Sequence, residues 1–576
     1  MELASLLTNY PLKMFNQKAF DILNSSINSV VFIDEKAKDF FTGPVNYDIL
    51  EEKLSVNLFN TFKENGKSLA VHKFEVSNLT NPNTLDYLFK GRDLILLDWE
   101  LAGVAGQEHS LKLLSRAVST PHINFCCIYS SSTNFNEIPL FLDTYFSGIS
   151  KDEFDTIKNS YNHIEPFEIQ KIWNEGEEKI DVFFQENDID LENLPLEKLK
   201  NKSRYIILRY IYISLTSDKY IIPENPEREF EVLTAGNDSF IINNTFVLAL
   251  KKDVDSDSDY NNLLKRISDA IVKNNGSFFQ LLGLEMQSVF NSNERFIDET
   301  ILKSSTEALF QFRNHLKDDK TFATIIKKLL IEQATLKLRT AKLELLKPDF
   351  LDFKSQDLEN KTPTHDDLFQ LNVFYNSVTV KGLHPESIPN LNFGDVFIDE
   401  KGTYYLCVTA LCDCYDPNKI QGNFYFVIGK EFKNIDLALK LGDTAFINFL
   451  PTNTAVYWGN LESAKFAEIE KQKENESIDA YRVRKLTNEI EGYRQFLYKP
   501  FYVKPQVFNV ENNKLIDDKL RVWDISNKYS EQELNQNLNC FNLTYITTLR
   551  NDYTQRIANH AFGHPARVGV DFVKIK

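Results

Sequence analysis

The sequence predicts a multidomain protein of the α/β plus α+β class that begins with a doubly wound α/β domain. A chain of 576 residues is too long to fold around one hydrophobic core. An apolar content of 43% with only 18 Pro and 20 Gly favours packed domains over disordered tracts. Short apolar runs alternate with helical patterns in residues 1–164, and helical and then strand-like patterns follow. Together these observations predict several packed domains.

Composition and charge limit the partners and the compartment. No apolar stretch reaches the roughly twenty residues that cross a membrane, and the start has no secretory leader, so we expect a cytoplasmic protein without a membrane partner. Six cysteines in so long a chain do not form a disulfide framework. The formal charge of −17 argues against extended contact with a nucleic acid backbone.

The first predicted domain, residues 1–164, contains four candidate strands. The apolar runs Val30–Ile33, Leu94–Leu97 and Ile123–Tyr129 each end in polar residues, and the segment TYFSGISK, which ends at Lys151, is the fourth candidate. Ligand sites of open α/β sheets lie at the carboxyl ends of the strands. We therefore expect one edge to gather two acidic residues after the first strand, one after the second, a hydroxyl and a lysine.

These residues resemble the receiver domain of bacterial two-component response regulators, which has a flavodoxin-like fold. The resemblance implies that Asp98, in RDLILLDWELAG, is the phosphoacceptor. It also implies that Ser130 senses the phosphoryl group and that Lys151 pairs with it. The implied cofactor is Mg²⁺, whose ligands would be Asp34, Glu35, Asp98 and the backbone carbonyl of Glu100. A carboxylate that attacks phosphorus needs the transferred charge neutralised, and a metal ion with an ammonium supplies this.

The remaining predicted regions have no motif that carries a mechanism. We expect a helical region at residues 165–350 and a mainly β domain at 365–510, with a helical insertion at about 461–498. The hexapeptide VFIDEK of the first strand recurs at residues 396–401 between glycines, where it predicts a β-hairpin. Cys407, Cys412 and Cys414 indicate a buried strand more than a metal site, because no second ligand pair is near. Residues 511–576 form the last segment, with a helix at about 547–562.

The whole pattern is similar to the large receiver proteins of bacterial anti-phage loci, the response-regulator components of Detocs systems. That resemblance implies a sensor histidine kinase as partner. A downstream effector protein and a second copy of the chain are further candidate partners. We expect no enzymatic activity. Two alternatives stay open. One is a receiver fold that serves only as an interaction scaffold. The other makes the C-terminal half a nucleotide-degrading enzyme that uses His560, His564 and Arg567, although common catalytic motifs are missing from the sequence.

Overall fold

The structure is a computed structural model, and the chain divides into two compact units. The first unit consists of Met1–Phe296 and Ala334–Glu359, and the second of Ile297–Gln333 and Asn360–Lys576. The structure describes residues 2–38, 43–103, 106–120, 122–132, 135–172, 177–191, 193–199, 202–223, 232–234, 239–253, 259–273, 277–292, 303–315, 319–339, 341–358, 362–379, 388–441, 446–459, 477–478, 480–487 and 503–563. Within these ranges, no helix combines the length and the apolar character that a bilayer crossing requires.

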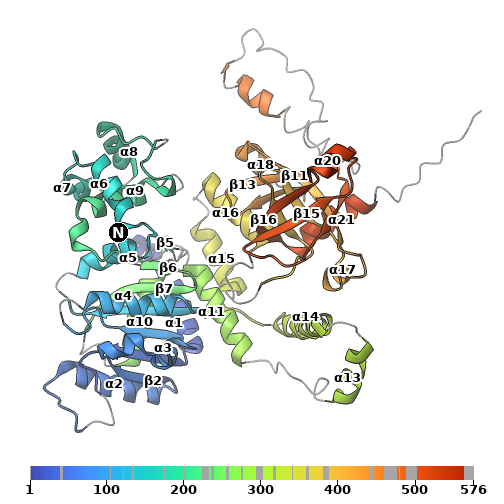
Figure 1. The fold of residues 1–576 in the computed structure, drawn as a ribbon. Coiled ribbons are helices and arrows are strands. Elements are labelled where there is room, and N and C mark those ends of the chain that lie inside the picture. Colours follow the sequence, from blue (N-terminus) through green and yellow to red (C-terminus); the bar gives the residue numbers. More distant parts are fainter. Residues whose placement is uncertain are drawn as a thin grey trace, which may run out of the picture. The chain divides into compact units, whose positions relative to one another are not determined.

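The first unit is built on one seven-stranded sheet with the order β2-β1-β3-β4-β7-β6-β5 (Figure 1). The first five strands in this order are parallel, and β6 and β5 add an antiparallel edge. The parallel part has the strand order of flavodoxin-like folds, with β7 as the fifth strand. The strands are β1 (Ser29–Asp34), β2 (Ser68–Lys73), β3 (Leu94–Leu97), β4 (Asn124–Ser130), β5 (Val232–Thr234), β6 (Ser239–Ile242) and β7 (Thr245–Lys251).

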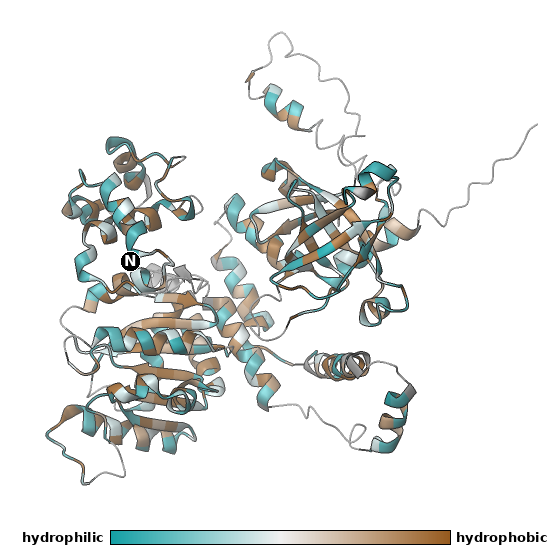
Figure 2. Cartoon of the chain, viewed as in Figure 1, coloured by the Kyte–Doolittle hydropathy of each residue, from teal (hydrophilic) through white to brown (hydrophobic). Residues whose placement is uncertain are grey.

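Helices cover both faces of this sheet, because alternate residues of its buried strands point to opposite sides. On β1, Val30 and Phe32 pack into one core and Val31 and Ile33 into the other. Figure 2 shows the resulting apolar strands between helices whose outer sides are hydrophilic. One face is covered by α1 (Glu2–Ser26), α2 (Leu50–Glu64), α10 (Tyr260–Val272), α11 (Ser277–Ser292) and α15 (Pro348–Asp357). The other face is covered by α3 (Pro82–Phe89), α4 (Gln107–Val118) and α5 (Ile138–Phe146).

A helical insertion separates the fourth and fifth parallel strands. It continues from α5 with α6 (Lys151–Ser160), α7 (Pro166–Ile172), α8 (Glu177–Glu186) and α9 (Arg204–Leu215). Arg209 of α9 and Asp143 of α5 form an ion pair in which both side chains are buried. The fourth predicted strand, TYFSGISK, is therefore wrong: Tyr145 and Phe146 end α5, and the parallel part of the sheet continues only at residue 245. The predicted boundary at residue 164 falls inside the insertion, and the predicted helical region contains β5, β6 and β7.

The second unit is built around a closed antiparallel barrel of six strands. The order is β9-β16-β15-β14-β11-β10, and β10 pairs with β9 to close the ring. The pair β12 and β13 extends from β11, and β8 pairs with β16. The strands are β8 (Ser377–Val378), β9 (Asp395–Ile398), β10 (Tyr404–Cys407), β11 (Asn423–Glu431), β12 (Ile447–Leu450), β13 (Thr454–Trp458), β14 (Pro505–Val510), β15 (Lys519–Asp524) and β16 (Cys540–Leu549).

The barrel confirms the predicted hairpin, since VFIDEK forms the end of β9 and the turn to β10. It contradicts the predicted boundary at residue 510, because β15 and β16 are barrel strands whose buried and exposed residues alternate. Most of the predicted insertion at 461–498 lies outside the described residues. Among the described residues of this unit, the helices include α13 (Thr306–His315), most of α14 (Asp319–Leu338), α16 (His365–Asn376), α17 (Leu411–Tyr415), α18 (Ile435–Lys440), α20 (Glu531–Asn535) and α21 (Asn551–Gly563).

Candidate functional site

Two carboxylates lie side by side at the carboxyl edge of the parallel sheet. Asp34 is the last residue of β1, and Asp98 directly follows β3. The two strands pair with Ile33 opposite Leu97, and the amide of Asp98 donates to the carbonyl of Ile33 at 3.0 Å. Both strands are almost entirely apolar before these positions, so the sheet buries them and leaves the two acids at its end.

One lysine joins both carboxylates. Lys252 directly follows β7, and its ammonium lies 2.7 Å from Oδ2 of Asp34 and 2.9 Å from Oδ1 of Asp98. Only 4% of its side chain is exposed, and its Nζ also lies 5.8 Å from the centre of the Tyr129 ring. The backbone amide of Lys252 donates to the carbonyl of Ser130 at 2.8 Å, which fixes it to the neighbouring strand.

Burial dominates the electrostatics of this cluster. It raises the pKa of Asp98 to about 6, against the attraction of Lys252, and the charge of Asp34 raises it further. Burial lowers the pKa of Lys252, but the attraction of Asp34 and Asp98 outweighs it, and the pKa lies above the ordinary value. The ammonium therefore stays charged at neutral pH, and Asp98 is mostly ionised there.

Hydroxyl groups line the adjoining strand end. Ser130 ends β4 and is buried, and its hydroxyl accepts a hydrogen bond from the amide of Ser132 at 3.1 Å. The Ser132 hydroxyl donates to the carboxylate of Glu100 at 2.6 Å, which ties the loop after β3 to the loop after β4. Ser110 of α4 donates to the carbonyl of Asp98 at 2.8 Å and so fixes the backbone of that loop.

Two of the predicted site residues do not join this cluster. Lys151 is the first residue of α6, where Ser150 caps the helix, and its side chain is exposed. Because Lys151 follows a helix and not a strand, it does not lie at the carboxyl edge of the sheet. Lys252 lies there instead. Glu35 follows Asp34, but the only charged contact of its carboxylate within the described part is Lys36 at 3.7 Å.

The oxygen atoms at the edge are a small donor set for a metal ion. Across the described residues, no group of three or more His, Cys, Asp and Glu side chains is placed to hold one. Asp34 and Asp98 are nevertheless two hard oxygen donors close together, with backbone carbonyls in the same loops. Mg²⁺ commonly takes one or two carboxylates and keeps several waters, so this donor set fits it.

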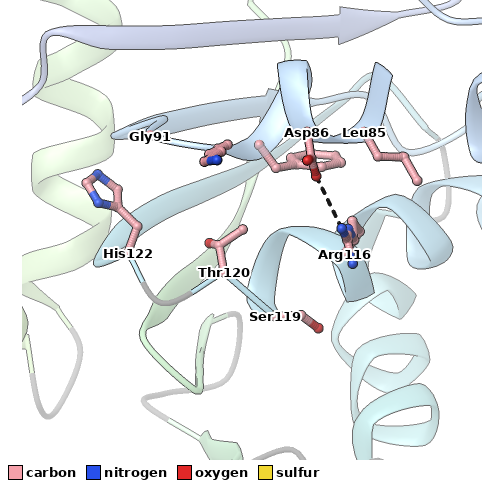
Figure 3. A pocket seen from close by; sticks show the side chains of 9 residues that line it. Leu85, Asp86, Gly91, Arg116, Ser119, Thr120 and His122 are labelled. Carbon is pink, nitrogen blue, oxygen red and sulfur yellow. Dashed lines mark hydrogen bonds and ion pairs between the residues drawn. The ribbon is translucent and has the colours of Figure 1, made fainter. Parts of the chain in front are cut away.

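A separate cavity of about 450 Å³ lies at the opposite, amino edge of the sheet (Figure 3). It is lined by the ends of α3 and α4, and Arg116 and Asp86 form an ion pair of 3.2 Å within it. His122, which also lines it, lies 3.2 Å from the carboxylate of Asp93, the residue before β3. Since Asp93 and Asp98 flank the same strand, this cavity is not part of the carboxylate cluster.

The candidate residues of the C-terminal half do not form a comparable cluster. His560 lies on α21 with its ring centre 4.7 Å from that of Phe446, and burial and then Arg556 lower its pKa. His564 and Arg567 lie outside the described residues. Cys407 is buried on β10, as expected, but Cys412 and Cys414 lie on the helix α17 and not on a strand, and Cys412 is exposed.

The comparison with known protein families agrees with the sheet. Residues 26–179 match the family model described as a response receiver domain. No curated protein and no solved structure matches the chain. The match includes the strands that carry both carboxylates and ends within the helical insertion, before the lysine that joins them. Residues 26–179 therefore resemble a receiver domain, and the fifth parallel strand of their sheet, β7, lies beyond the matched residues.

The sequence contains a local signal for Lys252. The run TFVLALKK is short and apolar and ends in charge, as do the runs before Asp34 and Asp98. Helical patterns surround it, so the sequence places it in the predicted helical region. The helices α6–α9 and the strands β5 and β6 separate it from β4, and this long separation hides its place in the sheet.

Proposed function

We propose that this protein is a response regulator in which Asp98 accepts a phosphoryl group from a sensor histidine kinase. The observation that carries the proposal is the buried contact of Lys252 with both Asp34 and Asp98 at the end of a receiver sheet. An ammonium at this position neutralises charge that a phosphoryl group brings. The match of residues 26–179 to the receiver family supports the same class of protein.

The residues of the cluster have separable tasks in this reaction. An oxygen of Asp98 forms the new bond to phosphorus, and the bond from phosphorus to the donor breaks, with its electron pair leaving on the donor. Mg²⁺, held by Asp34 and Asp98, would neutralise charge on the transferred oxygens when bound. Lys252 exchanges its contact with Asp98 for one with the phosphoryl oxygens, and Ser130, which ends the strand next to β3, supplies a hydroxyl for the same group.

Labelling with a small phosphoryl donor tests this proposal. The full-length protein is incubated with Mg²⁺ and acetyl phosphate, and the modified peptide is identified by mass spectrometry. We expect one phosphoryl group on the peptide that contains Asp98, and none in Asp98→Asn. Asp86→Asn is the matched control, since that exposed carboxylate lies in the same domain and pairs with Arg116. Equal labelling of wild type and Asp98→Asn would overturn the proposal.

We further propose that the pathway served is bacterial anti-phage defence, on the basis of the resemblance of the whole chain to receivers of such loci. A downstream effector and self-association belong to the same proposal. Phage plating on cells that carry the native locus tests it. We expect Asp98→Asn to change the plating efficiency at least tenfold in either direction relative to wild type, and an unchanged efficiency would contradict a role of phosphorylation in defence.

A further inference from the structure

The barrel of the second unit has a buried acid at one end of its interior. Asp395 is the first residue of β9 and lies two residues before Phe397, which packs inside the barrel with Tyr405 and Tyr545. Because alternate residues of a strand share a face, Asp395 points to the same side as Phe397. Only 3% of the surface of Asp395 is exposed. The interior of the barrel therefore ends in a carboxyl group.

Local backbone geometry places this carboxyl group. Gly394 has a φ of +95°, and a Cβ there would lie 2.7 Å from the carbonyl oxygen of Leu549, so only glycine allows the close approach of β9 to β16. The pairing of β16 with β9 is irregular between Tyr545 and Thr547. This bulge brings Thr548 opposite Asp395, and bulges often re-aim side chains beside binding sites.

The acid has hydrogen bonds but no cation. The Thr548 hydroxyl donates to Oδ1 at 2.7 Å, and the amide of Asn392 donates to Oδ2 at 2.7 Å. A carboxylate has about four acceptor positions, so two remain. Within the described residues no Lys, Arg or His pairs with it, and burial raises the pKa of Asp395 to about 7. A buried carboxylate without a counter-charge is unfavourable, and a bound cation would supply that charge.

A cavity of about 290 Å³ opens onto this group. Its wall is held by the paired segments around Leu391 and Leu515, whose backbone amides donate to Asn513 and Pro389. A hydrogen bond with Cys407 and burial raise the pKa of Cys414, so its thiol stays neutral beside the acid. The cavity is lined by Pro389, Asn390, Leu391, Asn392, Asp395, Cys414, Tyr415, Leu515 and Thr548. Apolar and aromatic walls with a few polar groups are typical of small-molecule sites, which often lie in barrel mouths.

We propose that this barrel mouth binds a small organic cation with a planar amidinium or guanidinium head, which Asp395 recognises. A planar N–H fork matches the two free acceptor positions of a carboxylate, and the walls from Leu391, Leu515 and Tyr415 accept an apolar body. The site is independent of the phosphoacceptor proposal, since all its residues belong to the second unit.

Titration of the full-length protein with benzamidine and with benzamide tests the proposal, because the two probes have the same shape and differ in charge. We expect benzamidine to bind wild type at least about tenfold more tightly than benzamide. Asp395→Asn should remove this preference. Asp399→Asn is the matched control: it makes the same change at the far end of β9, where Asp399 accepts from Tyr405, and should keep the preference.

A second variant covers the case in which Asp395→Asn does not fold. Asn390 is exposed at the rim of the cavity, and Asn390→Trp leaves the acid in place while filling the mouth. It should weaken benzamidine binding at least about tenfold. Equal binding of the two probes to wild type, or benzamidine binding that survives both Asp395→Asn and Asn390→Trp, would overturn the proposal.

Discussion

Replacing Asp98 by Asn should stabilise the metal-free protein at neutral pH. Its pKa rises from an ordinary 3.8 to about 6 on folding, chiefly through burial. At roughly 1.4 kcal/mol per pKa unit, the ionised Asp98 lowers the free energy of unfolding by about 3 kcal/mol at pH 7. The asparagine carbonyl still accepts from Lys252, and the pair of Lys252 with Asp34 remains. This figure already includes the attraction between Lys252 and Asp98, because that attraction lowers the pKa of Asp98.

The sign of the pH dependence separates this effect from general stabilisation. A carboxyl group with a raised folded pKa binds more protons when folded, so its penalty is small below about pH 4 and grows as pH rises through about 6. Thermal melts in EDTA should therefore show Asp98→Asn above wild type by several degrees at pH 7.5 and by about half as much at pH 5. Asp86→Asn, on the exposed surface, should melt like wild type at both values. An Asp98→Asn difference that is absent or equal at the two pH values would refute the reasoning.

Three further predictions concern buried charge. Lys252→Met should lower the unfolding free energy by about 3–5 kcal/mol, measured by urea denaturation, because it leaves two carboxylates without their cation. Arg209→Met should lower the free energy of unfolding by a similar amount, because it leaves the buried Asp143 without a cation. Urea denaturation of the double variant Arg209→Met with Asp143→Leu should show that most of this loss is restored. A double variant as unstable as Arg209→Met would contradict this explanation. Mg²⁺ at about ten times its Kd should stabilise wild type by about 1.4 kcal/mol in thermal melts, and Asp34→Asn should reduce that gain; identical gains would exclude Asp34 as a ligand.

The buried strands of the receiver were predictable from sequence because their signal is local. Val30–Ile33 and Leu94–Leu97 are apolar throughout and end at an acid, so both strands and Asp34 and Asp98 were placed correctly. The edge strand β2 was not predicted, since SLAVHK is only partly buried and mixes polar with apolar residues. Its partner β1 supplies the hydrogen bonds that make it a strand.

The lysine of the site was not predictable from local pattern alone. Lys151 follows an apolar stretch and the segment SGIS, which also fits a helix end and a capped helix start. Lys252 follows a clearer strand, but helices α6–α9 and the hairpin of β5 and β6 stand between it and the other strands. Which of two strand-like runs completes a sheet depends on tertiary pairing, here the register of Ser130 with Lys251.

The burial of the cluster also exceeded what the sequence indicated. Burial is the largest cause of the raised pKa of Asp98, and the charge of Asp34 is a smaller one. The sequence around the two acids contains no signal for the lysine between them, because Lys252 lies far along the chain. The barrel boundary was missed for a related reason, because β15 and β16 close a ring with strands far earlier in the chain.

The rate of phosphoryl labelling in two lysine variants tests the account most directly. Wild type, Lys252→Ala and Lys151→Ala are labelled with acetyl phosphate and Mg²⁺, and phosphate on the peptide containing Asp98 is followed over time. If Lys252 neutralises the transferred charge, Lys252→Ala should slow labelling about a hundredfold, whereas the exposed Lys151 can be replaced without effect. Slow labelling of Lys151→Ala with a normal rate for Lys252→Ala would contradict the assigned site.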